Sequence, residues 1–245
     1  MKTNQEFKNA ALDALRGNWG KAVVATLIYV LVLSAVSGPF VYSSTQIQTQ
    51  MREMIGSAPT GYQAAAFITS PEFMALQQRA TRSSGISTLL QFLVVMPLSL
   101  GFLNAFRRLL VSSDNQILAN TLQISFNGYW RKVWGMLLMY ILVFLWSLLL
   151  IIPGIIKWFS YAMTPFILEE NPELGAQEAI HRSRMMMRGH KFDLFWLYLS
   201  FIGWFLLSIL TAGIGLLWLT PYVDTSLAAF YEEIKADYAL NGGLD

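Results

Sequence analysis

The side chains of this chain that are best suited to binding chemistry form a basic cluster in its second half. The cluster extends from His181 to Lys191 and contains Arg182, Arg184 and Arg188. Each Lys or Arg close to an anionic membrane surface contributes about 1 kcal/mol of attraction. The cluster is therefore predicted to contact anionic lipid headgroups; the alternative is that it only fixes the orientation of the chain. Two adjacent basic pairs are expected to contribute to the same contact: Arg107, Arg108, Arg131 and Lys132.

A metal site is not expected. Glu178 and His181 have the Glu-x-x-His spacing of helical di-iron sites, which need two such pairs and two further Glu. The chain contains only two His, and His190 has no Glu three residues before or after it. It contains no Cys, which excludes disulfides, thiolate ligands and Cys nucleophiles. Motifs of serine hydrolases, zinc proteases and phosphate-binding loops are absent from the sequence. We predict no catalytic residue, no cofactor and no enzymatic activity.

Asp224 is the one acidic residue inside a long apolar stretch. A carboxylate within a membrane is by default a functional hypothesis. Pro221 also leaves the carbonyl of Leu217 without its helical donor, so the two features together would suit a polar cavity in a transporter. The interpretation that we favour is that Asp224 caps the inner part of a helix.

The composition is that of an integral membrane protein. Of 245 residues, 55% are hydrophobic and 13% are charged, whereas soluble domains carry about 25% charged residues. The net charge of +2 is too balanced for a nucleic-acid-binding surface. A bilayer core needs about 20 helical residues. Charged residues are absent between Lys21 and Arg52, Arg82 and Arg107, Lys132 and Lys157, and Asp193 and Asp224.

These gaps predict an all-α protein with a single membrane domain. Two shorter apolar stretches follow turn signals at Pro153-Gly154 and at Gly213-Ile214-Gly215 and return the chain to its starting side. Ser70-Pro71-Glu72 predicts the start of a short helix over 71–82, within an outer loop at 43–85. The predicted spans are six: 22–42, 86–106, 133–152, 155–168, 194–211 and 214–230.

The basic residues predict the orientation, because cytoplasmic loops carry the excess of Lys and Arg. With six spans, 13 of the 17 basic residues fall on one side, and the other side has Arg52, Arg79, Arg82 and Lys157. Both termini are therefore predicted to be cytoplasmic.

The sequence also suggests a degenerate threefold repeat. Gly17, Gly128 and Gly189 each follow a segment compatible with an amphipathic helix, at 5–16, 116–127 and 173–188, and each precedes a long uncharged span. The second span of each pair carries an interior proline that is expected to break its helix: Pro97, Pro165 and Pro221. We expect three hairpins, each preceded by a cytoplasmic amphipathic helix; chance similarity among apolar helices is the alternative.

A set of short motifs resembles a known family. In chain order they are Arg16-Gly17-Asn18-Trp19, Ile152-Pro153-Gly154, Ser160-Tyr161, Thr164-Pro165, Glu178-Ala179 with Ser183, Met187, Gly189 and Lys191, Gly213-Ile214-Gly215, Pro221-Tyr222 and Ala229-Phe230-Tyr231. The set resembles the bacterial integral-membrane family called domain of unknown function nine-seven-five. The resemblance implies a multi-pass protein of the bacterial cytoplasmic membrane, with no established substrate or catalytic residue. A distant similarity to membrane domains fused to glycerophosphodiester phosphodiesterases would imply lipid neighbours.

Two functions are compatible with these features. The first is a non-enzymatic component that contacts lipid headgroups or partner proteins through a basic cytoplasmic face. The alternative is a transporter or channel that uses the proline-broken helices and Asp224.

Overall fold

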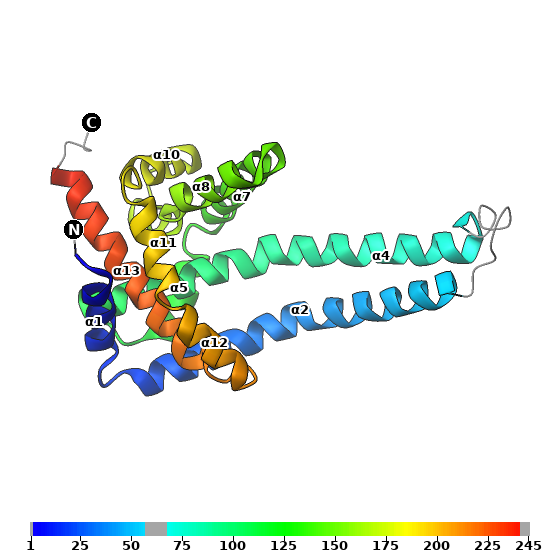
Figure 1. The fold of residues 1–245 in the computed structure, drawn as a ribbon, viewed down its shortest axis with the longest axis horizontal. Helices are drawn as coiled ribbons and strands as arrows, with labels where there is room; N and C mark the ends of the chain where they lie inside the picture. The colour runs from blue at the N-terminus through cyan, green and yellow to red at the C-terminus, as the bar shows by residue number, and fades with distance from the viewer. Residues whose placement is uncertain (1, 57–67, 241–245) are drawn as a thin grey trace. The chain divides into compact units, whose positions relative to one another are not determined.

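The computed structural model describes residues 2–56 and 68–240, and every regular element in these ranges is a helix (Figure 1). The chain divides into two compact units, one made of Met1–Tyr29 with Met96–Asp245 and the other of Val30–Val95. The helices are α1 (Asn4–Leu15), α2 (Trp19–Gly56), α4 (Pro71–Leu90), a π-helical turn η1 (Gln91–Val95), α5 (Met96–Ser112), α6 (Ile117–Phe126), α7 (Tyr129–Leu149), α8 (Ile151–Tyr161), α9 (Thr164–Glu170), α10 (Ala176–Met186), α11 (Lys191–Leu199), α12 (Ile202–Leu210) and α13 (Leu216–Leu240).

Five helical stretches of the described chain are long and apolar enough to cross a membrane. They are Trp19–Gly56, Pro71–Ser112, Tyr129–Leu149, Ile151–Glu170 and Lys191–Leu210. Most of the predicted sixth span, 214–230, lies in α13, and this helix is not among them. The reason is that α13 carries polar residues along its length, from Asp224 to the charged residues of its last turns. Five candidate spans therefore stand, and six remain a prediction.

The segment predicted as an outer loop is largely helical. α2 continues past residue 43 to Gly56, and α4 begins at Pro71, where the sequence predicts a helix start. The Ser70 hydroxyl accepts a hydrogen bond from the Phe73 N–H at 3.3 Å, as expected of a helix cap. Residues 43–56 and 83–85 of the predicted outer loop are thus helical. The remaining part of that loop, 57–67, lies outside the described residues.

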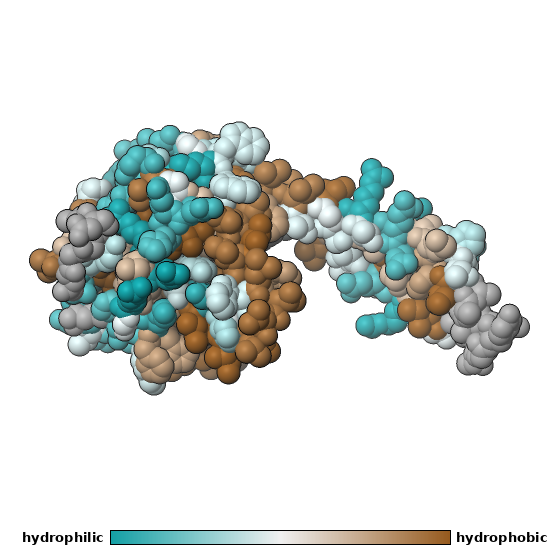
Figure 2. Space-filling model, turned by 90° about the horizontal axis from the view of Figure 1, so that it is seen from above, coloured by the Kyte–Doolittle hydropathy of each residue, from teal (hydrophilic) through white to brown (hydrophobic). Residues whose placement is uncertain are grey.

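Large apolar side chains cover much of the surface of the first unit. Leu148, Leu149, Leu150, Ile151 and Ile152, where α7 meets α8, are each more than 60% exposed. In Figure 2 the hydrophobic residues of this unit gather on one side of it and the hydrophilic residues on the other. Soluble monomers rarely expose such continuous apolar surface. This unit therefore has the surface expected of a protein embedded in lipid.

In each predicted repeat, a glycine with a positive φ angle follows the short helix. Gly17, Gly128 and Gly189 have φ angles of 77°, 61° and 85°, in the left-handed region that favours glycine. Each glycine separates a short helix, α1, α6 or α10, from a longer apolar stretch. The three turns share the geometry that the predicted repeat requires.

The short helices pack in a cyclic order. α6 packs on α5, α10 packs on α9, and α1 packs on α13, so each contacts the helix that ends the preceding predicted repeat. For α1 the apolar residues Phe7, Ala11 and Leu15 are at most 1% exposed, and the Phe7 ring meets the Phe230 ring of α13 at 5.4 Å between centroids. The first unit is thus closed by contact between its first and last helices.

The prolines and glycines predicted to break helices lie at different places relative to the helices: inside them, at their starts and in the turns between them. Pro97 lies within the continuous helical stretch Pro71–Ser112, just after the π-helical turn η1. Pro165 is the second residue of α9, where the fixed φ of proline suits a helix start. Pro221 lies inside α13, which continues through it. Gly213 adopts a φ of 86° in the turn before α13, and Gly215 immediately precedes that helix.

The sequence predicts a turn at Pro153 and Gly154, and this position is wrong by three residues. The break falls at Leu150, whose φ of −161° is extended, and both residues lie in the first turns of α8. Proline is tolerated there because a first-turn N–H has no helical acceptor.

Candidate functional site

A group of connected polar side chains in the first unit lies at the end of α9 and centres on Glu170. Arg107 of α5 donates from Nη2 to Glu170 at 2.8 Å and from Nε to Glu232 of α13 at 2.5 Å. The Tyr231 hydroxyl donates to the second oxygen of Glu170 at 2.5 Å, and Lys235 pairs with the first. A guanidinium is suited to such a position, because its rigid fork of donors can serve two carboxylates at once.

Glu169 forms a second group with one residue from each predicted basic pair, Arg108 and Lys132. It accepts from Arg108 Nη2 at 3.1 Å and from Lys132 Nζ at 2.5 Å. Lys132 also donates to the backbone carbonyl of Ile124, and its side chain is only 2% exposed. Arg108 also donates to Asn120 Oδ1 at 3.1 Å. The two adjacent acids thus join helices α5, α6, α7, α9 and α13.

Two more of the predicted lipid-contacting cations, Arg131 and Arg182, donate hydrogen bonds to residues at and after the end of α9. Arg131 donates to the carbonyls of Leu168, Asn171 and Leu174 at 2.5, 3.3 and 3.3 Å. These include acceptors that a helix end leaves without a donor. Arg182 donates to Asn171 Oδ1 at 3.2 Å.

The structure therefore divides the predicted lipid-contacting residues. Five of the eight are used inside the protein: Arg107, Arg108, Arg131, Lys132 and Arg182. A headgroup would have to displace a carboxylate or a carbonyl to bind them. The geometry gives no support to lipid contact by these five.

Arg184, Arg188 and Lys191 differ from the other five. Over residues 2–56 and 68–240 they make no ion pair or hydrogen bond, and Arg184 and Arg188 are exposed. The neighbouring acids are engaged: Glu178 accepts from the Gly175 N–H at 2.9 Å at the start of α10, and Asp193 lies 3.4 Å from His190. This basic face, defined as Arg184, Arg188 and Lys191, is the candidate binding surface.

Asp224 lies in the middle of α13 and not at a helix end. The interpretation of Asp224 as a cap is wrong, because the helix runs unbroken from Leu216 to Leu240. Within the described chain Asp224 has no hydrogen-bond or ion-pair partner, while its charge acts on the hydroxyls of Tyr29 and Tyr198. The two tyrosines come from α2 and α11, and the sequence pattern did not associate them with Asp224.

Sequence reasoning also missed two close approaches that repeat. A Cβ on Gly154 would lie 2.8 Å from the Cα of Ser147, and a Cβ on Gly215 would lie 2.9 Å from the Cα of Ser208. Small residues let apolar helices approach closely within a membrane. The shared signal, a Ser seven residues before a Gly in two of the predicted repeats, was available in the sequence.

Comparisons with curated proteins and with solved structures gave no match. A family model described as "Protein of unknown function (DUF975)" matches residues 1–238. The match includes α1 to α12 and all but the last two residues of α13, and the chain therefore belongs to the DUF975 family of proteins of unknown function.

Proposed function

We propose that this protein is a non-enzymatic, multi-pass component of the bacterial cytoplasmic membrane that contacts anionic lipid headgroups through its basic face. The observation that carries the proposal is the difference between the two sets of cations. Five are paired within the protein, whereas Arg184, Arg188 and Lys191 have no carboxylate partner in the described chain. Unpaired surface cations are the kind of group that anionic headgroups attract.

The proposal includes a topology and an architecture. Six spans form three hairpins, the termini lie in the cytoplasm, and α1, α6 and α10 lie near the cytoplasmic interface. Support comes from the excess of basic residues near these helices and from Trp130, which is 73% exposed beside Arg131. Tryptophan is enriched at the level of the headgroups. No cofactor and no catalytic step is part of the proposal.

The test measures binding of anionic lipid by the purified full chain in phosphatidylcholine nanodiscs, with phosphatidylglycerol as the added lipid. The double variant Arg184→Gln/Arg188→Gln should weaken binding by about thirtyfold, since each residue contributes about 1 kcal/mol. The matched control, Arg16→Gln/Lys21→Gln, removes the same charge from exposed positions outside the basic face. Equal losses in the two variants, or no preference for the anionic lipid, would contradict the proposal.

A second candidate function is solute or proton transport, and one observation favours it. Asp224 lies in a mostly apolar helix, and its carboxylate has no ion-pair partner in the described part of the chain. Such groups mark ion or proton pathways in membrane proteins. A proteoliposome flux assay tests this candidate: a pH-dependent flux that is lost in Asp224→Asn would favour transport over lipid contact.

A further inference from the structure

The turn between α10 and α11 contains a histidine that lies between two carboxylates. His190 Nε2 is 3.2 Å from Asp237 Oδ2 of α13, and His190 Nδ1 is 3.4 Å from Asp193 Oδ2 in the first turn of α11. The side chain of His190 is 20% exposed, and those of Asp193 and Asp237 are 46% and 50% exposed. Protons from water therefore reach this group, which links α13 to the start of α11.

The protonation of the imidazole decides how many of these contacts can be hydrogen bonds. A neutral imidazole has one N–H donor and one acceptor nitrogen, whereas an ionised carboxylate only accepts. The neutral ring therefore donates to one aspartate and turns a lone pair toward the other. The protonated ring donates to both. Histidine is the side chain whose charge ordinarily changes between about pH 5 and 8. Both contacts are thus satisfied together only when His190 is protonated.

Most other charged groups of the surrounding helices have contacts of their own. Glu233, one turn before Asp237 on α13, pairs with Lys2 at 3.2 Å. Apart from Arg184 and the exposed His181, the charged side chains of the helices packed on α11 and α13 have these contacts: Glu6 with Thr3, Lys8 with the Ser200 carbonyl, Asp13 with Arg16, Arg107 with Glu170 and Glu232, Arg108 with Glu169, Lys157 with the Trp146 ring, Glu178 with Gly175 and Arg182 with Asn171. Asp193 and Asp237 are therefore the acids of the described chain that face His190.

His190 also lies within the basic face along the chain. It stands between Arg188 and Lys191, next to Gly189 with its φ of 85°. The His190 N–H bonds to the Met187 carbonyl at 3.3 Å, and the His190 carbonyl accepts from the Leu194 N–H at 3.1 Å. Holding the His190 ring therefore holds the turn that separates Arg188 from Lys191. Its protonation also adds a positive charge between these two cations.

We propose that His190, Asp193 and Asp237 form a proton-operated clamp that joins α13 to the α10–α11 turn and strengthens lipid contact by the basic face at acidic pH. The inference rests on the lipid contact proposed above and adds its regulation. At alkaline pH two carboxylates face a neutral ring, and their charges oppose a nearby phosphate. On acidification the imidazolium balances one of these charges and fixes the turn. Lipid binding should therefore tighten as the pH falls.

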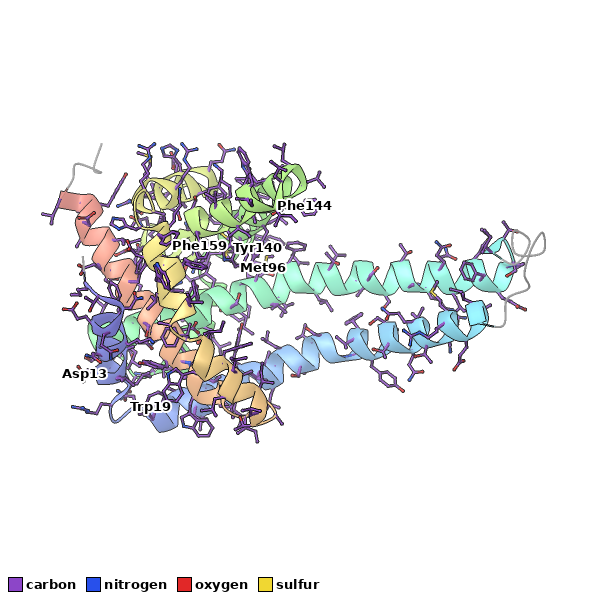
Figure 3. All side chains as sticks on the ribbon, viewed as in Figure 1. Asp13, Trp19, Met96, Tyr140, Phe144 and Phe159 are labelled. Atoms are coloured by element: carbon purple, nitrogen blue, oxygen red, sulfur yellow. The ribbon has the colours of Figure 1, made fainter. Side chains whose placement is uncertain are left out.

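Helix α11 keeps other contacts when the clamp is open. The Phe159 ring of α8 meets the Phe195 ring at 6.1 Å between centroids, and Figure 3 shows the Phe159 side chain beside α11. At the other end of α11, Lys8 of α1 donates to the Ser200 carbonyl at 2.9 Å. Replacing His190 is therefore expected to loosen the turn without unfolding the helix.

The first experiment is the nanodisc titration with phosphatidylglycerol at about pH 8 and about pH 5.5. It uses the full chain with His181→Gln, which leaves His190 as the single histidine. Binding should be about fivefold tighter at the lower pH, because one more positive charge faces the phosphate. The matched control, His181→Gln/His190→Gln, should bind equally at both pH values.

The outcomes of this titration separate the clamp from the proposed function. Binding that still needs Arg184 and Arg188 but does not depend on pH in the single-histidine chain would refute the clamp and leave the proposed function standing. An equal pH dependence in the control would assign it to other groups and also refute the clamp. No preference for phosphatidylglycerol at either pH would refute both.

The second experiment separates the clamp from the added charge alone. Hydrogen exchange is measured over the last turns of α13, residues 233–240, and corrected for the intrinsic rate at each pH. In the single-histidine chain these amides should exchange about fivefold more slowly at the lower pH, and Asp237→Asn should abolish the difference. Asp237 is half-exposed and lies outside the turn, so this variant tests the clamp even if His190→Gln fails to fold. Equal protection at both pH values in the single-histidine chain would overturn the inference.

Discussion

Replacing Lys132 with methionine tests whether the ion pairs at the end of α9 hold the first unit together. Lys132 is 2% exposed and bonds to Glu169 at 2.5 Å and to the Ile124 carbonyl. Breaking a buried ion pair by removing one partner costs about 3–5 kcal/mol. Glu169 keeps Arg108 as a partner at 3.1 Å, and methionine fills most of the volume of the lysine stem, so the lower end of this range applies. We expect a loss of about 3 kcal/mol.

The assay is thermal unfolding of the purified protein in detergent. For a chain of this size, about 3 kcal/mol corresponds to a fall in Tm of about 6–12 °C. Lys21→Met is the matched control, because Lys21 is exposed and makes no ion pair in the described part of the chain. Lys132→Met combined with Glu169→Gln should recover part of the loss, since the carboxylate that has lost Lys132 is then replaced by a neutral amide. A Tm for Lys132→Met equal to that of Lys21→Met would refute the structural role of the cluster.

Three further outcomes follow from individual contacts. Gly154→Ala should lower Tm more than Gly203→Ala, because the added Cβ meets Ser147 in the first case and open space in the second; equal shifts would contradict the close approach of α7 and α8. Hydrogen bonds from the backbone and hydroxyl of Thr3 hold the pKa of Glu6 below its ordinary value, so the stability from this pair is present above that value and is lost as the pH falls through the lowered pKa. The Tm of Thr3→Ala should therefore depend less on pH below about 4.5 than that of the wild type, and an unchanged pH profile would argue against the capping box. Asp224→Asn should leave Tm unchanged or raise it, since an unpartnered carboxylate is removed; a fall in Tm would reveal a partner that the described chain does not show.

Much of the architecture could be predicted because the membrane restricts where charges can lie. Four uncharged stretches and the shorter apolar stretch at 155–168 located the five candidate spans, and the glycines at 17, 128 and 189 located three left-handed turns. The boundaries were less predictable. The helix through 43–56 is rich in Ser, Thr and Gln, and its Ser44, Thr45 and Thr49 hydroxyls donate to carbonyls three or four residues earlier. Such bonds let polar residues remain helical where composition alone suggests a loop.

The candidate site was less predictable than the fold, because a basic residue in a sequence does not reveal its partner. Arg107, Arg131 and Arg184 belong to similar basic clusters, yet of these three only Arg184 has no partner among the described residues. Which cation pairs with Glu169 or Glu170 depends on how α5, α7 and α13 meet α9. These contacts join residues up to 65 positions apart. The count of charges on each side limits how many cations can be paired but does not say which ones.

The packing of α1 on α13 has a consequence for biosynthesis. Phe7 finds its partner Phe230 only after about 220 further residues have been made. At about 5–20 residues per second, the apolar side of α1 waits roughly 10 to 45 seconds for its helix partner. During this interval that side has α5, which Leu15 also contacts, and the surface of the membrane as available places. Chains that stop before α13 should therefore carry an N-terminal helix that a protease removes readily, and completed chains should protect it.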